Sequence, residues 1–190
     1  MTLRDAVYGL YGAYRLAWLD KSGLSFLDRT GEGALRSFAV LFFVQPAYAL
    51  IVLLRGEAEG DDVYAALALR MLSYVVGWLA YLLLCWQIVR RIGRENRYAG
   101  FVVAYNWASV LQIGIYLPVE VLIAGQWLPP DAIAAIAVII LLASAAYQWF
   151  VTKAALEVSG LMAFGLVLTD LLVTKVVSDL AAMPALQGAT

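Results

Sequence analysis

The residue of this chain most suited to chemistry is Asp170, which lies inside the last apolar run, residues 158–177. At ~1.5 Å per residue, its carboxyl group would sit ~18 Å along a helix, near the middle of a membrane. A charge at that depth costs at least ~2.5 kcal/mol unless it faces protein or water, which favours a proton or cation site. A helix-packing hydrogen bond explains Asp170 equally, as does a final helix that ends near Lys175 and Asp179.

Polar residues of the third apolar run form a second candidate set. Asn106 and Ser109 are three residues apart and share a helix face, and Gln112 follows on another face. Thr174 lies one helical turn after Asp170, on the same face. These side chains predict either helix–helix hydrogen bonds, worth under ~2 kcal/mol each, or the lining of a polar path with Asp170.

Further charges lie near the ends of the apolar runs. Arg70 and Glu120 could pair across neighbouring helices or extend to the membrane surface. The segment RRIGRENR, residues 90–97, supplies a basic cluster that could contact anionic lipid headgroups, at ~1 kcal/mol for each basic residue. Its members are Arg90, Arg91, Arg94 and Arg97. Retention of this loop in the cytoplasm explains them as well.

The residues that are missing argue against an enzyme. Histidine is absent, which excludes Ser-His catalysis and most zinc sites, and the single Cys85 cannot form an intramolecular disulfide. Asp170 is one intramembrane aspartate where an aspartyl protease needs two, and there is no glycine-rich phosphate loop. A net charge of −1 argues against nucleic-acid binding. We therefore predict a non-enzymatic protein without metal or cofactor.

The elements that must position these residues are membrane-spanning helices. Hydrophobic residues make up 64% of the chain and the mean hydropathy is +0.82. Residues 71–89 carry no charge, and ~20 apolar residues are enough to cross a bilayer as a helix. The predicted fold class is an all-α bundle of five transmembrane helices within residues 34–180. Their predicted ranges are 35–54, 64–89, 98–125, 132–151 and 158–177.

Residues 1–33 are predicted to form a cytoplasmic amphipathic helix and a linker. Apolar residues recur at helical spacing over residues 3–19, and this stripe comprises Leu3, Val7, Leu10, Tyr14 and Trp18. The helix would lie in the membrane interface or pack on the cytoplasmic face of the protein. A loose tail is expected over residues 181–190.

The basic residues predict the orientation. Ten of the 13 Lys and Arg residues precede the first span, fall in the second connection or follow the fourth span. Only Arg55, Arg70 and Lys175 lie on the opposite side. The positive-inside rule therefore places the N-terminus in the cytoplasm and, after five crossings, the C-terminus outside. We expect a multi-pass protein of the bacterial inner membrane.

Two stretches, LRSFAVLFFVQPAYALIVLL at 35–54 and RRIGRENRYAGFVVAYNWASVLQIGIYLP at 90–118, give the chain a recognisable layout. With five spans, a cytoplasmic N-terminal segment and a basic connection before the third span, it resembles bacterial Yip1-domain membrane proteins. The DLYGP-type signature of the eukaryotic relatives is absent. The resemblance implies membrane organisation or partner binding and assigns no site residues.

The function predicted first is a membrane scaffold or accessory subunit that acts through helix packing with itself or with a larger complex. The lipid bilayer and a homo-oligomer or larger assembly are then its expected partners. The alternative is a small oligomeric transporter or channel that uses Asp170 and the polar face of the third helix. The two differ in whether Asp170→Asn leaves a folded protein active.

Overall fold

The computed structural model of this chain describes residues 2–58 and 62–187, with side chains described as far as residue 181. Every regular element in these ranges is helical, which confirms the predicted all-α class. The α-helices are α1 (Leu3–Ala17), α2 (Gly31–Ser37), α3 (Leu41–Leu54), α4 (Val63–Arg91), α5 (Glu95–Ala124), α6 (Pro130–Leu156) and α7 (Gly160–Gln187). Two short 3-10 helices, η1 (Lys21–Phe26) and η2 (Phe38–Val40), complete the described elements.

Five helical segments are long and apolar enough to cross a membrane, so the chain is a multi-pass membrane protein. The first is the continuous segment Gly31–Leu54, made of α2, η2 and α3. The others are α4, α5, α6 and the Gly160–Ala181 part of α7. At ~1.5 Å per residue, the 30 residues of α5 exceed a hydrocarbon core of ~30 Å. Its ends therefore reach the headgroup regions.

The helix ends differ from the predicted ranges where local capping and charge pairing act. The first span begins at Gly31, because the Thr30 side chain caps the helix by accepting from the Gly33 amide at 3.0 Å. The α6 helix passes residue 151 and ends at Leu156, before Glu157 in the left-handed conformation. The tail expected from residue 181 is helical as far as Gln187.

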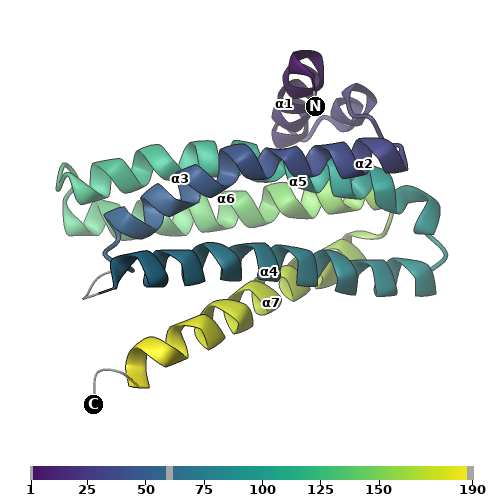
Figure 1. Ribbon diagram of the computed structural model, residues 1–190. Helices are drawn as coiled ribbons and strands as arrows, with labels where there is room; N and C mark the ends of the chain where they lie inside the picture. The colour runs from purple at the N-terminus through teal and green to yellow at the C-terminus, as the bar shows by residue number, and fades with distance from the viewer. Residues whose placement is uncertain (1, 59–61, 188–190) are drawn as a thin grey trace.

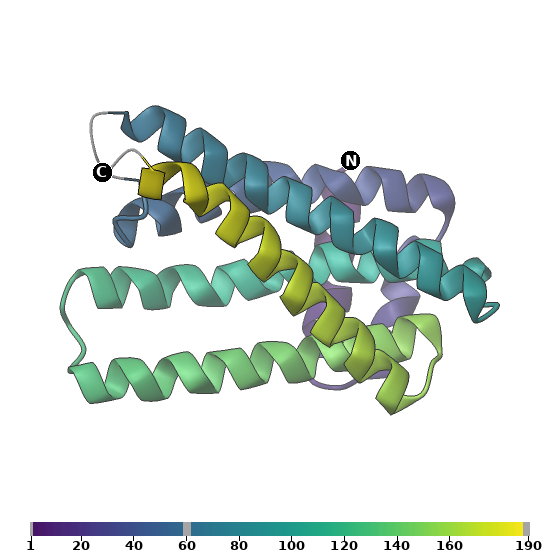
Figure 2. The ribbon, with the colours of Figure 1, turned by 90° about the horizontal axis from the view of Figure 1, so that it is seen from below.

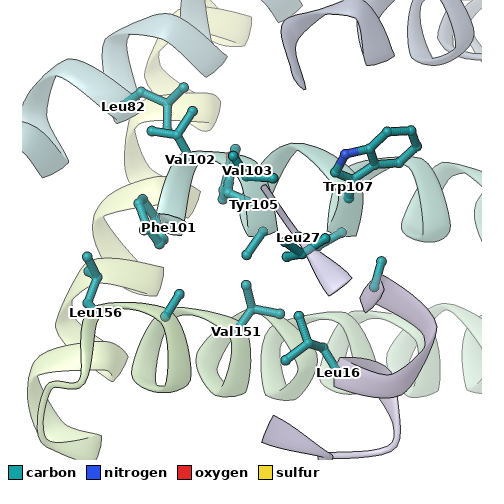
Figure 3. Close-up of a cluster of buried hydrophobic side chains, with 14 of the residues drawn as sticks. Leu16, Leu27, Leu82, Phe101, Val102, Val103, Tyr105, Trp107, Val151 and Leu156 are labelled. Carbon is teal, nitrogen blue, oxygen red and sulfur yellow. The ribbon is translucent and has the colours of Figure 1, made fainter. Parts of the chain in front are cut away.

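The α5 helix is the centre of the bundle, where its residues 100–108 are all buried. It packs against α1, α2, α3, α4 and α6 (Figure 1). Apolar side chains from α4, α5 and α6 make up most of the core, and Leu16 of α1 joins them (Figure 3). The α7 helix crosses the other helices diagonally and packs against α4 and α6 (Figure 2).

The α1 helix lies across the bundle, roughly perpendicular to the spanning helices (Figure 1). Its buried face is made of Gly9, Gly12, Ala13 and Leu16, which lets it approach α5 and α6 closely. The Tyr147 hydroxyl of α6 donates to the Ala13 carbonyl at 2.9 Å. The five residues of the predicted apolar stripe remain exposed, so that stripe does not pack on the chain's own bundle.

Candidate functional site

The structure places Asp170 in a cavity of about 440 Å³ between α4, α5, α6 and α7. Three other residues predicted as an intramembrane polar site, Ser109, Gln112 and Thr174, line the same cavity. The separate helix faces predicted for Ser109 and Gln112 are wrong, because these residues are three apart on α5 and both line the cavity. Asp170 and Thr174 are four apart on α7 and share a face, as the spacing predicts. Two helices that are far apart in sequence therefore present polar side chains to one space within the membrane-spanning bundle.

Asp170 has one hydrogen-bond donor among the side chains of the described residues. The Tyr105 hydroxyl of α5 lies 3.1 Å from each carboxylate oxygen of Asp170. Tyr105 is itself buried against Trp78 and Tyr81, so its hydroxyl is held in place. A carboxylate has about four acceptor sites, so Asp170 keeps the capacity to bind another donor or a cation.

The charge of Lys175, which also lines the cavity, is balanced on its own helix. Its ammonium group lies 2.9 Å from a carboxylate oxygen of Asp179, one turn along α7. Asp179 is not part of the lining, and Asp170 is the one carboxylate among the described lining residues. The electrostatic character of the cavity is therefore set by a single acid that no ion pair within the described chain neutralises.

Asn106, which the sequence grouped with Asp170, is separated from the cavity by the structure. It is fully buried and faces α2, where its amide nitrogen donates to the Ser37 hydroxyl at 2.8 Å. Its amide oxygen accepts from the Trp78 indole nitrogen at 3.1 Å, and Ser37 donates onward to the Ala34 carbonyl at 2.7 Å. We name this row of hydrogen bonds the Asn106 chain. It fastens α5 to α2 and α4.

Arg70 and Glu120 do not form the direct ion pair that the sequence suggested. Both belong to one row of four charged residues. Glu120, which is 7% exposed, accepts from the Arg55 guanidinium. Arg55 also lies 3.6 Å from Glu57, whose other carboxylate oxygen lies 3.8 Å from Arg70. The turn after α3 places Arg55 and Glu57 between Arg70 of α4 and Glu120 of α5. Helical spacing in the sequence could not reveal this position. The row joins α3, α4 and α5 at one end of the bundle.

The basic cluster of residues 90–97 lies at the opposite end of the bundle (Figure 1). Arg97 and Arg94 pair with Glu157 at 2.9 and 3.9 Å, which ties the α4–α5 turn to the α6–α7 turn. The Arg90 guanidinium stacks over the Trp86 ring at 5.7 Å, and Arg91 is exposed. Two of the four arginines thus have a structural role, and their contact with anionic lipid stays a prediction.

Several residues of the cavity were not predicted from the sequence. Tyr74, Trp78, Tyr105 and Gln148 all line it. Gln148 is 7% exposed, and its side-chain oxygen has no hydrogen-bond partner among the described residues. The one sequence signal was the spacing of Tyr74 and Trp78, one helical turn apart, but aromatic residues facing lipid have the same spacing.

A second cavity, of about 650 Å³, lies between α1, η1, α2 and α5. Three of its four charged side chains, those of Asp5, Asp28 and Arg36, are used within the chain. Asp5 caps α1 through the Thr2 amide at 2.8 Å, and Asp28 pairs with Arg36 at 2.5 Å. Hydrogen bonds from Thr2 lower the pKa of Asp5, and hydrogen bonds from Thr30 lower that of Asp28. These carboxylates hold the N-terminal layer together, so this cavity is the weaker candidate.

The Asp170 cavity can hold a proton or a small cation, and its hydroxyl and amide groups can bind a polar solute. Among the described residues, no group of three or more Asp, Glu, His or Cys side chains could hold a metal ion. Comparisons of the chain with protein-family models, curated proteins and solved structures gave no match. The functional proposal therefore rests on the membrane-spanning fold and on the residues of this cavity.

Proposed function

We propose that this membrane protein binds a small cation, or a solute that moves with a proton, in the Asp170 cavity and acts as a small oligomeric transporter or channel. The observation that carries the proposal is the gathering of Asp170, Thr174, Ser109 and Gln112 around one space between four helices. Ser109 donates to the Asn106 carbonyl at 2.7 Å and Gln112 to the Ser144 carbonyl at 3.5 Å, whereas the Asp170 carboxylate keeps acceptor sites without a partner in the described chain. The gathered side chains surround a volume that can admit a solute.

The energetics favour a cationic species at Asp170. An uncompensated carboxylate in a transmembrane helix costs at least ~2.5 kcal/mol, and a bound cation or proton removes that cost. The neighbouring cation, Lys175, is paired with Asp179 and so does not fill this role. Intramembrane ionisable residues commonly mark ion paths and proton relays for the same reason.

The proposed orientation has the N-terminus in the cytoplasm of a bacterium, in the inner membrane. The bundle supports it, because the basic turn of residues 90–97 and the α6–α7 turn lie at one end (Figure 1). The C-terminal end of α3 and the α5–α6 turn lie at the other end. The end with more Lys and Arg is expected to face the cytoplasm.

Liposome flux tests the proposal. The purified chain is reconstituted with a pH-sensitive dye inside, and a potassium diffusion potential, negative inside, is applied with valinomycin. We expect uptake of protons, or of sodium followed with a sodium-sensitive dye, above that of empty liposomes. Asp170→Asn should lower that uptake at least tenfold, whereas Asp131→Asn, which removes an acid at the start of α6 outside the cavity, should leave it unchanged.

Uptake that Asp170→Asn does not change would contradict the proposal. So would the absence of uptake above that of empty liposomes, provided that the reconstituted chain has the helical circular dichroism of the detergent-purified protein. Both variants remove one negative charge, so a difference between them reports the position of that charge rather than its loss.

A second candidate function, membrane scaffold or accessory subunit, is favoured by the exposed stripe on α1. Leu3 is 82% exposed and Trp18 is 72% exposed, and the stripe is available to a lipid surface or a partner. The layout shared with Yip1-domain proteins agrees with this candidate. Mass spectrometry of the protein extracted in polymer nanodiscs tests it. A stoichiometric partner that is lost when Val7, Tyr14 and Trp18 are changed to Ser would support a scaffold.

A further inference from the structure

We infer that the ligand of the Asp170 cavity is an organic ammonium ion, a cationic nitrogen that carries apolar substituents. This inference rests on the proposed binding function of the cavity and names its substrate class. Three features of the cavity support it: its aromatic wall, its single carboxylate and a buried acceptor without a partner.

The aromatic wall is continuous along α4 and α5. The Tyr74 and Trp78 rings have centroids 5.8 Å apart, and those of Trp78 and Tyr105 are 6.4 Å apart. Tyr116 extends the aromatic lining along α5. Aromatic faces attract cations through their quadrupole, most strongly where water is excluded, and such cages bind quaternary ammonium groups. The same rings pack against apolar substituents, which a hydrated inorganic ion does not have.

The charge and donor set disfavour other ligand classes. Calcium takes six to eight oxygen ligands, and magnesium demands near-octahedral oxygen geometry. The described lining offers one carboxylate, with Asp170 bonded to Tyr105 on one side. An anion would meet the uncompensated Asp170 charge, and Lys175 is engaged by Asp179. One carboxylate facing several aromatic rings suits a monovalent organic cation.

Gln148 of α6 supplies the third feature. Its side chain is buried, at 7% exposure, and lines the cavity, while its amide oxygen accepts no hydrogen bond from the described residues. Leaving a buried acceptor without a partner costs about 1–3 kcal/mol. An ammonium N–H would supply the missing donor. The cavity volume, about 440 Å³, falls within the ~300–1,000 Å³ range of small-molecule pockets.

Calorimetric titration of the full chain in lipid nanodiscs tests the inference, with benzyldimethylammonium, which carries one N–H, as the probe and empty nanodiscs as the blank. We expect saturable binding of one probe per chain. Benzenesulfonate, which keeps the ring and lacks the cation, should give no such binding. Sodium, which keeps the charge and lacks the apolar groups, should bind far more weakly than the probe. Asp170→Asn should weaken probe binding at least tenfold, and Asp131→Asn should not change it.

The aromatic contribution is tested at Tyr116, which lines the cavity and is partly exposed. Tyr116→Leu should weaken probe binding roughly fivefold, a typical cation–π contribution, while Tyr116→Phe keeps the ring and should bind like the natural chain. Equal binding by the Leu and Phe variants would overturn the aromatic part of the inference. The melting temperature of each variant shows whether it is folded.

The outcomes separate this inference from the proposed function. If benzyldimethylammonium fails to bind while Asp170-dependent proton or sodium uptake is present, the ligand class is wrong and the cation site stands. If neither binding nor uptake occurs, both are overturned. Binding that survives Asp170→Asn would place the probe elsewhere and would also overturn the inference.

Discussion

Two neighbouring residues of α5, Tyr105 and Asn106, lead to regions of opposite character. On the Asn106 side, each polar group in the row from Trp78 through Asn106 to Ser37 has a hydrogen-bond partner. On the Tyr105 side, Asp170 and Gln148 retain unused capacity for hydrogen bonds around a cavity of about 440 Å³. Both regions are polar and lie within the spanning bundle.

The difference teaches that a polar residue in a membrane helix marks a site only when its bonding is incomplete. Asn106 is the more deeply buried of the two residues that the sequence grouped together, yet its two contacts explain it fully. Asp170 is less buried and less satisfied. The two regions also meet at Trp78, whose indole nitrogen joins the Asn106 chain while its ring forms part of the cavity wall.

The largest expected effect comes from breaking the satisfied side. Asn106→Leu removes the acceptor of the Trp78 indole N–H and the donor to the Ser37 hydroxyl. The buried Trp78 N–H is then left without a hydrogen-bond partner. An orphaned buried polar group costs about 1–3 kcal/mol, so we expect unfolding in SDS mixed micelles to show a loss of about 2 kcal/mol. Asp170→Asn should not lower the same free energy, because Tyr105 can still donate to the amide oxygen and the cost of an uncompensated charge is removed. Equal losses of unfolding free energy in the two variants would contradict the proposed difference between the two sides of α5.

Glycine substitutions test the packing on the two sides of α5. A methyl group at Gly9 of α1 would lie 2.1 Å from the Trp107 ring, which is itself buried. Gly9→Ala should therefore cost at least about 1 kcal/mol through overpacking, measured by the same unfolding. Gly114→Ala meets nothing within 4 Å and should be neutral or stabilising by about 0.5 kcal/mol. A harmless Gly9→Ala would show that α1 docks more loosely than this contact requires.

A substitution at Gln148 should change the unfolding free energy in the opposite direction to one at Asn106. Replacing Gln148 with Met keeps a similar length and removes the acceptor that has no partner. We expect the unfolding free energy to rise by up to about 1 kcal/mol in the absence of ligand. Asn106→Met serves as the control, since the same change on the satisfied side should lower it. A loss of stability in Gln148→Met would indicate that the amide already has a partner.

The smallest effect concerns pH and the N-terminal layer, outside the spans. Hydrogen bonds from Ser22, then the contact with Arg15, lower the pKa of Asp20 from 3.8 to about 2. The folded state thus favours the charged form, and the stability from this group is present above pH 4 and lost as the pH falls toward 2. Asp20→Asn should show a shallower loss over that interval when the melting temperature is followed. An unchanged slope would rule out this contribution.

Most of the fold could be predicted because the membrane dictates it. A long uncharged run such as residues 71–89 must become a helix, so α4 was placed within two residues of its observed ends. The predicted start of the first span, residue 35, was wrong by four residues, because the residues up to 33 were interpreted as a linker. In the structure, Arg36 pairs with Glu32 at 3.4 Å and with Asp28, and the helix continues past them.

The site was predictable only in part. Helical spacing shows which residues share a helix face, but not which other helix that face contacts. It could place Asp170 with Thr174 on one face, but not decide whether Asn106 or Ser109 turned towards them. The row of charges shows the same gap, since Glu120 pairs with Arg55, a residue that lies after the end of α3. Gln148 gave no signal, because a single glutamine in an apolar run resembles any packing residue.

The position of Tyr105 directly before Asn106 has a consequence for how sequence change would affect α5. Consecutive helical residues are rotated by ~100°, so the two roles are separated by angular phase alone. A one-residue deletion earlier in α5 would turn the amide towards the cavity and the phenol away from it, with composition almost unchanged. A substitution on this helix thus affects one side of it, whereas a shift of its register would exchange the positions of the cavity-lining Tyr105 and the packing residue Asn106.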